Sequence, residues 1–144
     1  MYVELHCHSA FSFLDGASLP DELAQAAVRL GHRTLALTDH NSVSGSMELA
    51  VAGRALGLRV IHGAELDLDD GRHLTLLVAD RRGWSNLCRI LTHAHARTRD
   101  VRPGAPPAGP AAPLDSVLHH AEGLYCLSGC ALHGVHDEPT LRRL

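Results

Sequence analysis

The sequence lacks several features that define well-known protein classes. Its N-terminus, MYVELHCHS, has no basic segment followed by an apolar core, so no signal peptide is predicted and we expect a cytoplasmic protein. No apolar run approaches the roughly 20 residues of a membrane helix, so no membrane partner is expected. Lysine is absent: all 13 residues of the Lys/Arg type are arginine. The net charge is −3. This balance excludes a global basic patch for nucleic acid.

Several chemical signatures are also missing. The four cysteines show no disulfide framework spacing, and without a signal peptide they are expected to be reduced thiols (Cys7, Cys88, Cys126 and Cys130). There is no GxxxxGK[ST] phosphate loop and no GxGxxG fingerprint. A small zinc site formed by Cys130 with His133 and His136 is conceivable, but no second cysteine pair supports it.

Histidine is the residue in excess, with 12 copies in 144 residues. Histidine is the commonest metal ligand and a frequent proton-transfer group, so this excess points toward site chemistry. The remaining composition, 45% hydrophobic and 20% charged, is that of an ordinary soluble globular domain. The length predicts one domain.

Hydrophobic periodicity predicts alternating strands and helices. Ser18 is the expected N-cap of the first helix, in a capping box with Asp21, and Gly31 ends that helix. Asp70-Gly71 predicts a hairpin turn. The expected strands are 2–6, 34–38, 58–61 and 124–127, with hairpin arms 64–70 and 72–78 and further helices at about 45–56, 84–96 and 114–121. We therefore predict an α/β fold with four parallel strands plus a hairpin after the third.

The length limits what this pattern can form. A closed α/β barrel typically needs about 250 residues. The chain is therefore predicted to be either a small open sheet or the first part of a longer barrel. Residues 102–113 are rich in Pro, Gly and Ala and are expected to form a flexible loop.

Residues of metal-ligand type follow the predicted main strands. They are His6 and His8, Asp39 and His40, Glu65, and Cys130, with Asp15 in the loop after the first strand and His73 opening the second hairpin arm. Active sites of α/β folds lie where the carboxyl ends of parallel strands meet. We therefore expect these residues to converge.

The spacing of two histidine pairs leads to opposite predictions. Positions i and i+2 of a strand share a face, so His6 and His8 can reach one metal ion. His93 and His95 have the same spacing on a predicted helix, where the two side chains point in different directions and cannot chelate one ion.

The ligand set mixes imidazole and carboxylate with one thiolate. This mixture suits Zn²⁺ or Mn²⁺, with Fe as a third candidate, in a cluster of several ions. Such clusters are commonly used for phosphoester hydrolysis. Each residue also has a simpler interpretation that stays open: Asp39 as a helix cap, Cys130 as a small buried apolar residue, Asp15 as a loop end, and His62 as a residue without a metal role.

Six stretches resemble the PHP (polymerase and histidinol phosphatase) family. They are ELHCHSAFSFLDGAS (4–18), LALTDHNSVSGSMEL (35–49), GAEL (63–66), HLTLLV (73–78), GWSNLCRILTHAH (83–95) and EGLYCLSGC (122–130). FSFLDGAS together with NLCRILT and LSGC is most similar to the N-terminal PHP domain of bacterial family C DNA polymerase III alpha subunits, error-prone branch.

The resemblance implies a distorted barrel of seven strands and a set of metal ligands. Carried onto this sequence, the ligands are His6, His8, Asp15, His40, Glu65, His73 and Cys130, and we take Asp39 and His40 as catalytic candidates. The family's last Asp-x-His pair has no counterpart after Cys130. We therefore expect residues 1–144 to be a partial PHP domain, an incomplete barrel from a truncated, split or shortened gene, without polymerase domains and with weak or no activity alone.

Three functions follow from the resemblance. The leading one is a metal-binding piece of an error-prone DNA polymerase, active in DNA replication and damage-tolerant repair synthesis. Its own chemistry would be metal-dependent phosphoesterase or exonuclease activity. Its partners would be DNA, the polymerase domains, and other replication and repair factors. The second is a stand-alone phosphoesterase acting on a small phosphate ester such as histidinol phosphate. The third is a catalytically dead structural module.

Overall fold

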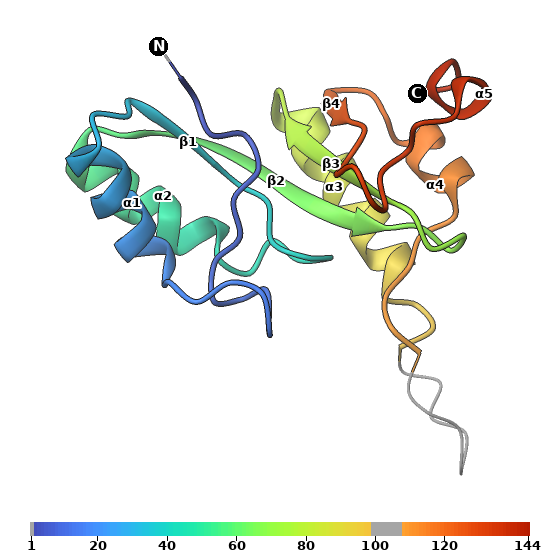
Figure 1. Ribbon diagram of the computed structural model, residues 1–144, viewed down its shortest axis with the longest axis horizontal. Helices are drawn as coiled ribbons and strands as arrows, with labels where there is room; N and C mark the ends of the chain where they lie inside the picture. Colours follow the sequence, from blue (N-terminus) through green and yellow to red (C-terminus); the bar gives the residue numbers. More distant parts are fainter. Residues whose placement is uncertain (1, 99–107) are drawn as a thin grey trace. The chain divides into compact units, whose positions relative to one another are not determined.

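The computed structural model describes residues 2–98 and 108–144 (Figure 1). The chain divides into two compact units, one up to Glu65 and one from Leu66 onward. Hydrogen bonding gives the strand order β1-β2-β3-β4 in an open sheet, which agrees with the predicted α/β class. The elements are α1 (Pro20–Arg29), β1 (Thr34–Leu37), α2 (Ser46–Leu56), β2 (Arg59–Asp67), β3 (His73–Val78), α3 (Arg81–Ala94), α4 (Leu114–His119), β4 (Leu124–Leu127) and α5 (Glu138–Leu141).

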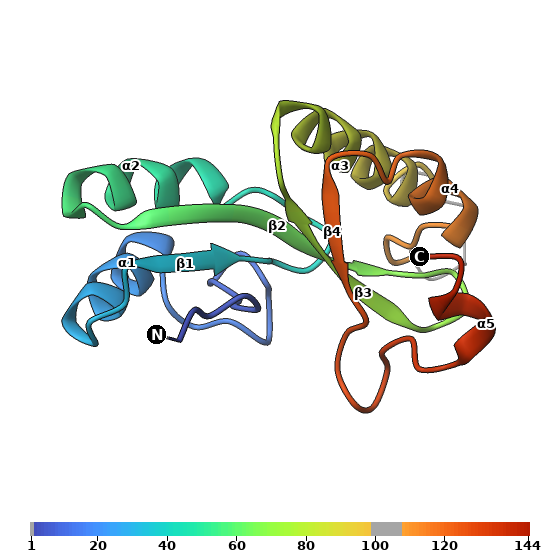
Figure 2. The same cartoon turned by 90° about the horizontal axis from the view of Figure 1, so that it is seen from above.

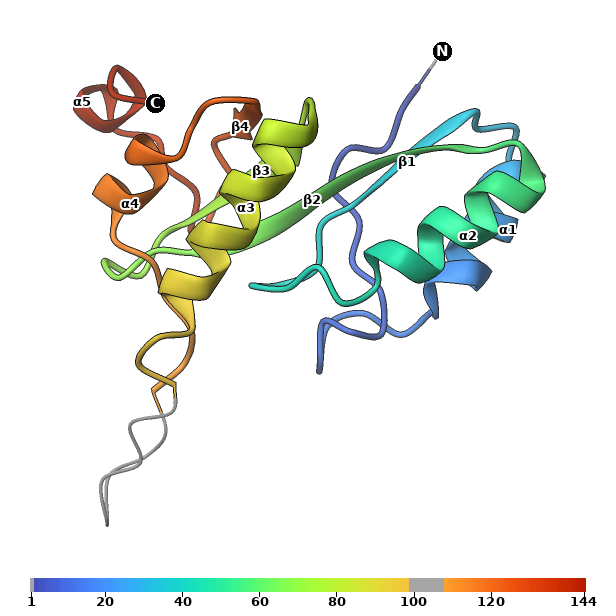
Figure 3. The same cartoon turned by 180° about the vertical axis from the view of Figure 1, so that it is seen from behind.

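The first unit contains the predicted parallel crossover. β1 pairs in parallel with β2, from Thr34 opposite Arg59 to Leu37 opposite His62. Figure 3 shows α1 and α2 lying side by side against this strand pair. The core between them is formed by small and branched apolar side chains: Ala24, Ala27, Leu35, Leu37, Leu49 and Leu58. Helix α2 ends at Gly57, which has a left-handed backbone (φ 68°) that suits glycine.

Two expectations at the start of the chain are wrong in detail. Residues 2–6 form no regular strand but a single parallel bridge, Glu4 with Leu35. The N-cap of α1 lies one residue later than the expected Ser18, because Pro20 takes the first helical position. Leu19 is the N-cap, and the Glu22 carboxylate, not Asp21, accepts its N–H at 2.8 Å.

The predicted third strand and the first hairpin arm are one continuous strand, β2. Gly63 and Ala64 are buried in its middle and do not interrupt it. The predicted turn at Asp70-Gly71 is confirmed. Gly71 has φ 86° and donates its N–H to the Leu68 carbonyl at 3.0 Å.

In the second unit β4 pairs with β3, and the pairing is antiparallel. The expected fourth strand is present as β4, but it pairs with the second hairpin arm, β3, and not in parallel with another main strand. Helices α3 and α4 connect the two strands and lie next to each other (Figure 2). Helix α3 begins at Arg81, earlier than expected, because the Asp80 carboxylate accepts the Gly83 N–H at 2.9 Å and caps it.

The Pro/Gly-rich stretch is described only in part. Residues 102–107 lie outside the described residues. At its end Ala112 is fully buried, donates its N–H to the Asp67 carbonyl at 2.9 Å and accepts the Asp69 N–H at 3.1 Å. Ala112 is therefore fixed in place, and the expected flexible loop does not extend to it.

The C-terminal residues add the short helix α5, which the sequence did not suggest. Arg72 of the hairpin pairs with Asp70 and with Asp137, the residue before α5. Among the described residues no helix is both long and apolar enough to cross a membrane.

We predict that Gly83→Ala destabilises the second unit. A Cβ at Gly83 would lie 1.8 Å from the carbonyl oxygen of Gly123, the residue before β4. The backbone of α3 or the backbone at Gly123 must therefore shift. Such overpacking costs about 1–3 kcal/mol. Urea unfolding followed by Trp84 fluorescence measures the loss. Gly109→Ala is the control, because its Cβ would meet nothing within 4 Å, and an equal loss in both variants would contradict the packing argument.

Candidate metal centre

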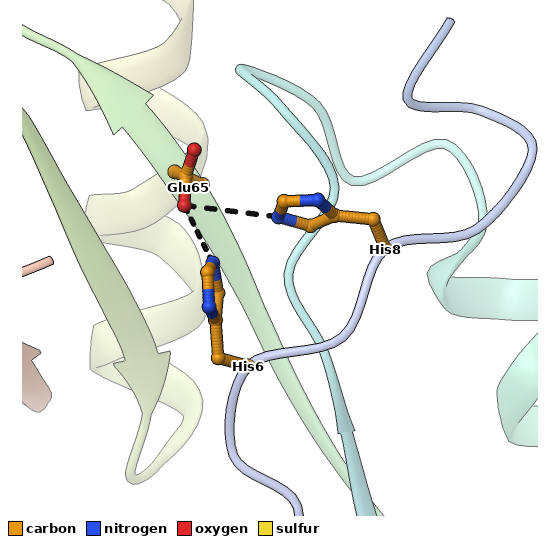
Figure 4. A group of neighbouring side chains, drawn as sticks. All are labelled: His6, His8 and Glu65. Carbon is orange, nitrogen blue, oxygen red and sulfur yellow. Dashed lines mark hydrogen bonds and ion pairs between the residues drawn. The ribbon is translucent and has the colours of Figure 1, made fainter. Parts of the chain in front are cut away.

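The segment His6-Cys7-His8 is held next to the end of β1 by hydrogen bonds between Cys7 and Thr38. Thr38 donates its N–H to the Cys7 carbonyl at 2.8 Å, and Cys7 donates its N–H to the Thr38 hydroxyl at 3.0 Å. Cys7 packs against the apolar core, and burial raises the pKa of its thiol. His6 and His8 both point toward Glu65 (Figure 4), with ring centroids 4.8 Å apart. The predicted common face of His6 and His8 is thus present without a regular strand.

Glu65 is the buried centre of the site. Glu65 lies near the end of β2 and is 2% exposed. One carboxylate oxygen, Oε2, lies 2.5 Å from His6 Nε2 and 3.7 Å from His8 Nε2 (Figure 4). The other oxygen, Oε1, lies 3.0 Å from His40 Nδ1. Three imidazoles therefore share one carboxylate.

His40 and Asp15 complete the cluster. His40 forms a parallel bridge with Glu65, and Asn41 donates its N–H to the Glu65 carbonyl at 2.7 Å. His40 Nε2 lies 3.2 Å from Asp15 Oδ2, and His8 Nδ1 bonds to the same oxygen. The His8 ring thus lies between Glu65 and Asp15 and contacts each through a different nitrogen.

The cluster contains two sets of three possible metal ligands. One is His6, His8 and Glu65, and the other is His8, Asp15 and His40; in each set the ligand atoms lie within 4.8 Å of one another. His8 Nε2 is buried and makes no hydrogen bond with the described residues, which suits a coordinating nitrogen. Neutral imidazoles and carboxylates are the donors that Zn²⁺ and Mn²⁺ accept, so the residues fit a divalent metal.

The electrostatics of the cluster follow from these contacts. Glu65 raises the pKa of His8 most, burial opposes it, and Asp15 adds to the rise. His8, and after it His40, lowers the pKa of the Asp15 carboxyl. The Asp15 carboxyl therefore keeps its negative charge to a lower pH than a free aspartate, while His8 takes up a proton more readily than a free histidine.

Asp39, a catalytic candidate from the sequence, bonds to the loop between His8 and Asp15. It is 1% exposed, and its carboxylate accepts hydrogen bonds from Ser9 and Ser12. It does not cap the next helix, because α2 begins at Ser46 after Gly45. Neither serine was predicted to have a role. Their only signal in the sequence is a position between the ligand-type residues His8 and Asp15, and the structure shows that both are buried.

His73 and Cys130 lie in the second unit and contact each other. Cys130 donates its N–H to His73 Nε2 at 3.1 Å, and its Sγ accepts the His133 N–H at 3.4 Å. His136 Nε2 lies 2.9 Å from the Cys130 carbonyl oxygen, not from its sulfur. Within the described part of the chain, neither set of three possible ligands includes these residues.

The histidines predicted to have no metal role are found outside both sets. His93 lies in α3 and its Nδ1 is 2.8 Å from the Ser116 hydroxyl, while His95 is the C-cap of that helix. His93 therefore lies on the helix as predicted, whereas His95 lies one residue past its end and caps it. His62 lies in β2, where burial lowers its pKa.

Solved structures with this fold include two from bacteria. A candidate metal-dependent phosphoesterase from Bifidobacterium adolescentis superposes with a TM-score of 0.70 at 15% identity, over 97% of this chain and 72% of that one. An amidohydrolase from Chromobacterium violaceum, solved with bound sulfate and no metal, gives 0.64 at 19% identity, over 98% and 71%. At these identities the likeness concerns the fold alone.

Curated relatives have much higher identity. The error-prone DNA polymerase of Symbiobacterium thermophilum is 44% identical over 138 residues, and that of Mycobacterium tuberculosis strain H37Rv is 39% identical over 140. The matches cover 90% of this chain but only 13% and 12% of those proteins. A family model described as the PHP domain matches residues 4–143, nearly the whole sequence, and the chain therefore belongs to the PHP domain family.

Proposed function

We propose that this chain is the metal-binding PHP part of an error-prone DNA polymerase and supports metal-dependent hydrolysis of phosphodiesters. The observation that carries the proposal is the pair of ligand sets that share His8. Two neighbouring sets supply donors for one ion or for a pair, and a pair of ions can clamp the attacking and leaving oxygens of a phosphoryl group. The match to relatives named error-prone DNA polymerases supports the polymerase context.

The proposed ligands are seven residues: His6, His8, Asp15, His40, Glu65, His73 and Cys130. The first five are supported by their mutual distances, and the last two by the family resemblance. Zn²⁺ or Mn²⁺ is the proposed metal, with Fe as the third candidate. When bound, such ions would lower the pKa of a coordinated water and neutralise charge on the phosphoryl oxygens.

The chain's own residues have separate tasks in this proposal. Glu65 is buried and orients the three imidazoles through its two oxygens. His40 is the proposed catalytic residue, because its side chain is 35% exposed and lies between Glu65 and Asp15, where it can contact a substrate phosphate. Asp15 is 54% exposed and stays anionic, so it can bind a metal from the solvent side.

The partners follow from the polymerase context. The chain spans about an eighth of the curated polymerases, so polymerase domains would supply synthesis and most of the DNA contact. A net charge of −3 agrees with DNA held mainly by other parts of the protein. We propose a cytoplasmic protein acting with replication and repair factors.

We predict that His6→Ala or His8→Ala removes bound Zn²⁺, whereas His93→Ala and His95→Ala do not. The first pair points at Glu65, and the second belongs to neither ligand set found among the described residues. Equilibrium dialysis followed by elemental analysis gives ions per chain. Equal metal loss in both pairs would refute the distinction between the two pairs.

We expect the contribution of His8 to the free energy of unfolding to fall with rising pH in the metal-free protein and to grow with rising pH in the metal-loaded protein. Its raised pKa means that protonated His8 stabilises the metal-free fold below about pH 6.5, and this is lost as the pH rises through the folded pKa. Metal binding needs neutral imidazole, so its contribution grows with pH. The measurement is the difference in unfolding free energy between wild type and His8→Asn, from pH 6 to 9. Parallel trends with and without Zn²⁺ would contradict a metal-binding His8.

We predict hydrolysis of a generic phosphodiester with Mn²⁺, measured in the polymerase-length protein that carries this chain. Glu65→Gln should reduce the rate by at least the roughly 10- to 100-fold that loss of a supporting partner costs at metal sites. His93→Ala is the control. A metal-loaded wild type with no hydrolysis would favour the structural module, and preference for histidinol phosphate over a diester would favour the stand-alone phosphatase.

A further inference from the structure

Asp39 is the most buried acidic residue beside the metal centre. It is 1% exposed, and hydrogen-bond donors surround its carboxylate. Oδ1 accepts the Ser9 N–H at 2.7 Å and the Ser12 hydroxyl at 2.8 Å, while Oδ2 accepts the Ser9 hydroxyl at 2.8 Å. These contacts occupy both oxygens with serine donors, and Asp39 belongs to neither ligand set found among the described residues.

The serine partners connect Asp39 to the ligands on either side. Ser12 Oγ accepts the His40 N–H at 3.0 Å, so the backbone of His40 is held by the same hydroxyl that bonds to Asp39. The Ser12 carbonyl accepts the Asp15 N–H at 3.1 Å, and Ser12 donates its own N–H to the Ser9 carbonyl at 2.9 Å. One carboxylate thus anchors the turn that begins after His8 and ends at Asp15.

The turn has little freedom to choose another path. A Cβ at Gly16 would lie 1.9 Å from the Ser9 carbonyl oxygen, so the chain closes tightly on itself there. Leu14 has φ 68°, a left-handed conformation that is unfavourable for a leucine, and its side chain is fully exposed. Apolar packing of Leu14 therefore does not hold the turn. Hydrogen bonds hold it, both within the turn, such as the Gly16 N–H to the Ser12 carbonyl at 2.9 Å, and from Ser9 and Ser12 to the Asp39 carboxylate.

We infer that Asp39 is a positioning residue, which sets the geometry of His8, Asp15 and His40 through Ser9 and Ser12 and does not itself bind metal. The inference rests on the proposed function, because it concerns ligands of the proposed metal. It also replaces the catalytic role suggested by the sequence, since a carboxylate fully engaged by serines does not face the reacting atoms.

The test compares Co²⁺ binding by wild type, Asp39→Asn, Ser12→Ala and the double variant in the full chain. Asp39→Asn keeps the shape of the side chain and removes its charge, whereas Ser12→Ala keeps the carboxylate and breaks its link to His40. We expect each single variant to lose about 10- to 100-fold in Co²⁺ affinity, the cost typical of supporting partners at metal sites. The number of ions at saturation should not change.

Two further readouts separate positioning from general destabilisation. The visible absorption of bound Co²⁺ should shift in both single variants, because it reports ligand geometry, and the double variant should lose little more than either single one. Asp21→Asn, the same charge change in the first turn of α1 of the same unit, should leave affinity and spectrum unchanged.

Each outcome decides between stated alternatives. Fewer ions at saturation in Asp39→Asn would make Asp39 a ligand, and wild-type affinity and spectrum in folded Asp39→Asn would overturn the inference. If Asp39→Asn does not fold, folded Ser12→Ala decides it: wild-type binding overturns the inference, and weakened binding supports it. Failure of the wild type to bind Co²⁺ would instead defeat the proposed function.

Discussion

The candidate metal centre depends on the backbone register of residues 38–41. Thr38 donates to the Cys7 carbonyl on one side, and on the other Glu65 donates its N–H to the Asp39 carbonyl at 3.1 Å. Side chains alternate along extended backbone, so these bonds decide which residues face the cluster. A slip of one residue would turn Cys7 toward Glu65 and bury His6 or His8 in the apolar core. The histidines meet because the backbone pairs in one register.

The spacing of histidines in the sequence was enough to predict part of this centre. A period of two places His6 and His8 on one side of extended chain, and this alternation persists although residues 2–6 form only one bridge with β1. The same spacing predicts that His93 and His95 diverge on a helix, and α3 contains His93 and ends just before its C-cap, His95. Local periodicity was reliable in both cases because it depends on backbone geometry alone.

Long-range pairing was not predictable in this way. Nothing local shows that Gly63 and Ala64 continue a strand, or that β4 adds to β3 in the antiparallel direction. The Ser9 and Ser12 contacts to Asp39 span 30 and 27 residues. A serine in a loop has many possible partners, so its role is determined only when the fold brings a buried carboxylate to it.

The burial of two carboxylates near each other indicates why such a site favours a cation. Burying an ionised carboxylate is costly unless hydrogen bonds or an opposite charge compensate it. Asp39 is compensated by neutral donors from Ser9 and Ser12. Glu65 faces three imidazoles instead, which compensate it fully only when protonated, and His8 Nε2 makes no hydrogen bond with the described residues. A divalent ion would compensate Glu65 and engage that nitrogen with the imidazoles neutral. The two buried acids thus differ in their partners: Asp39 is satisfied by the chain itself, and Glu65 is completed by the metal that we propose.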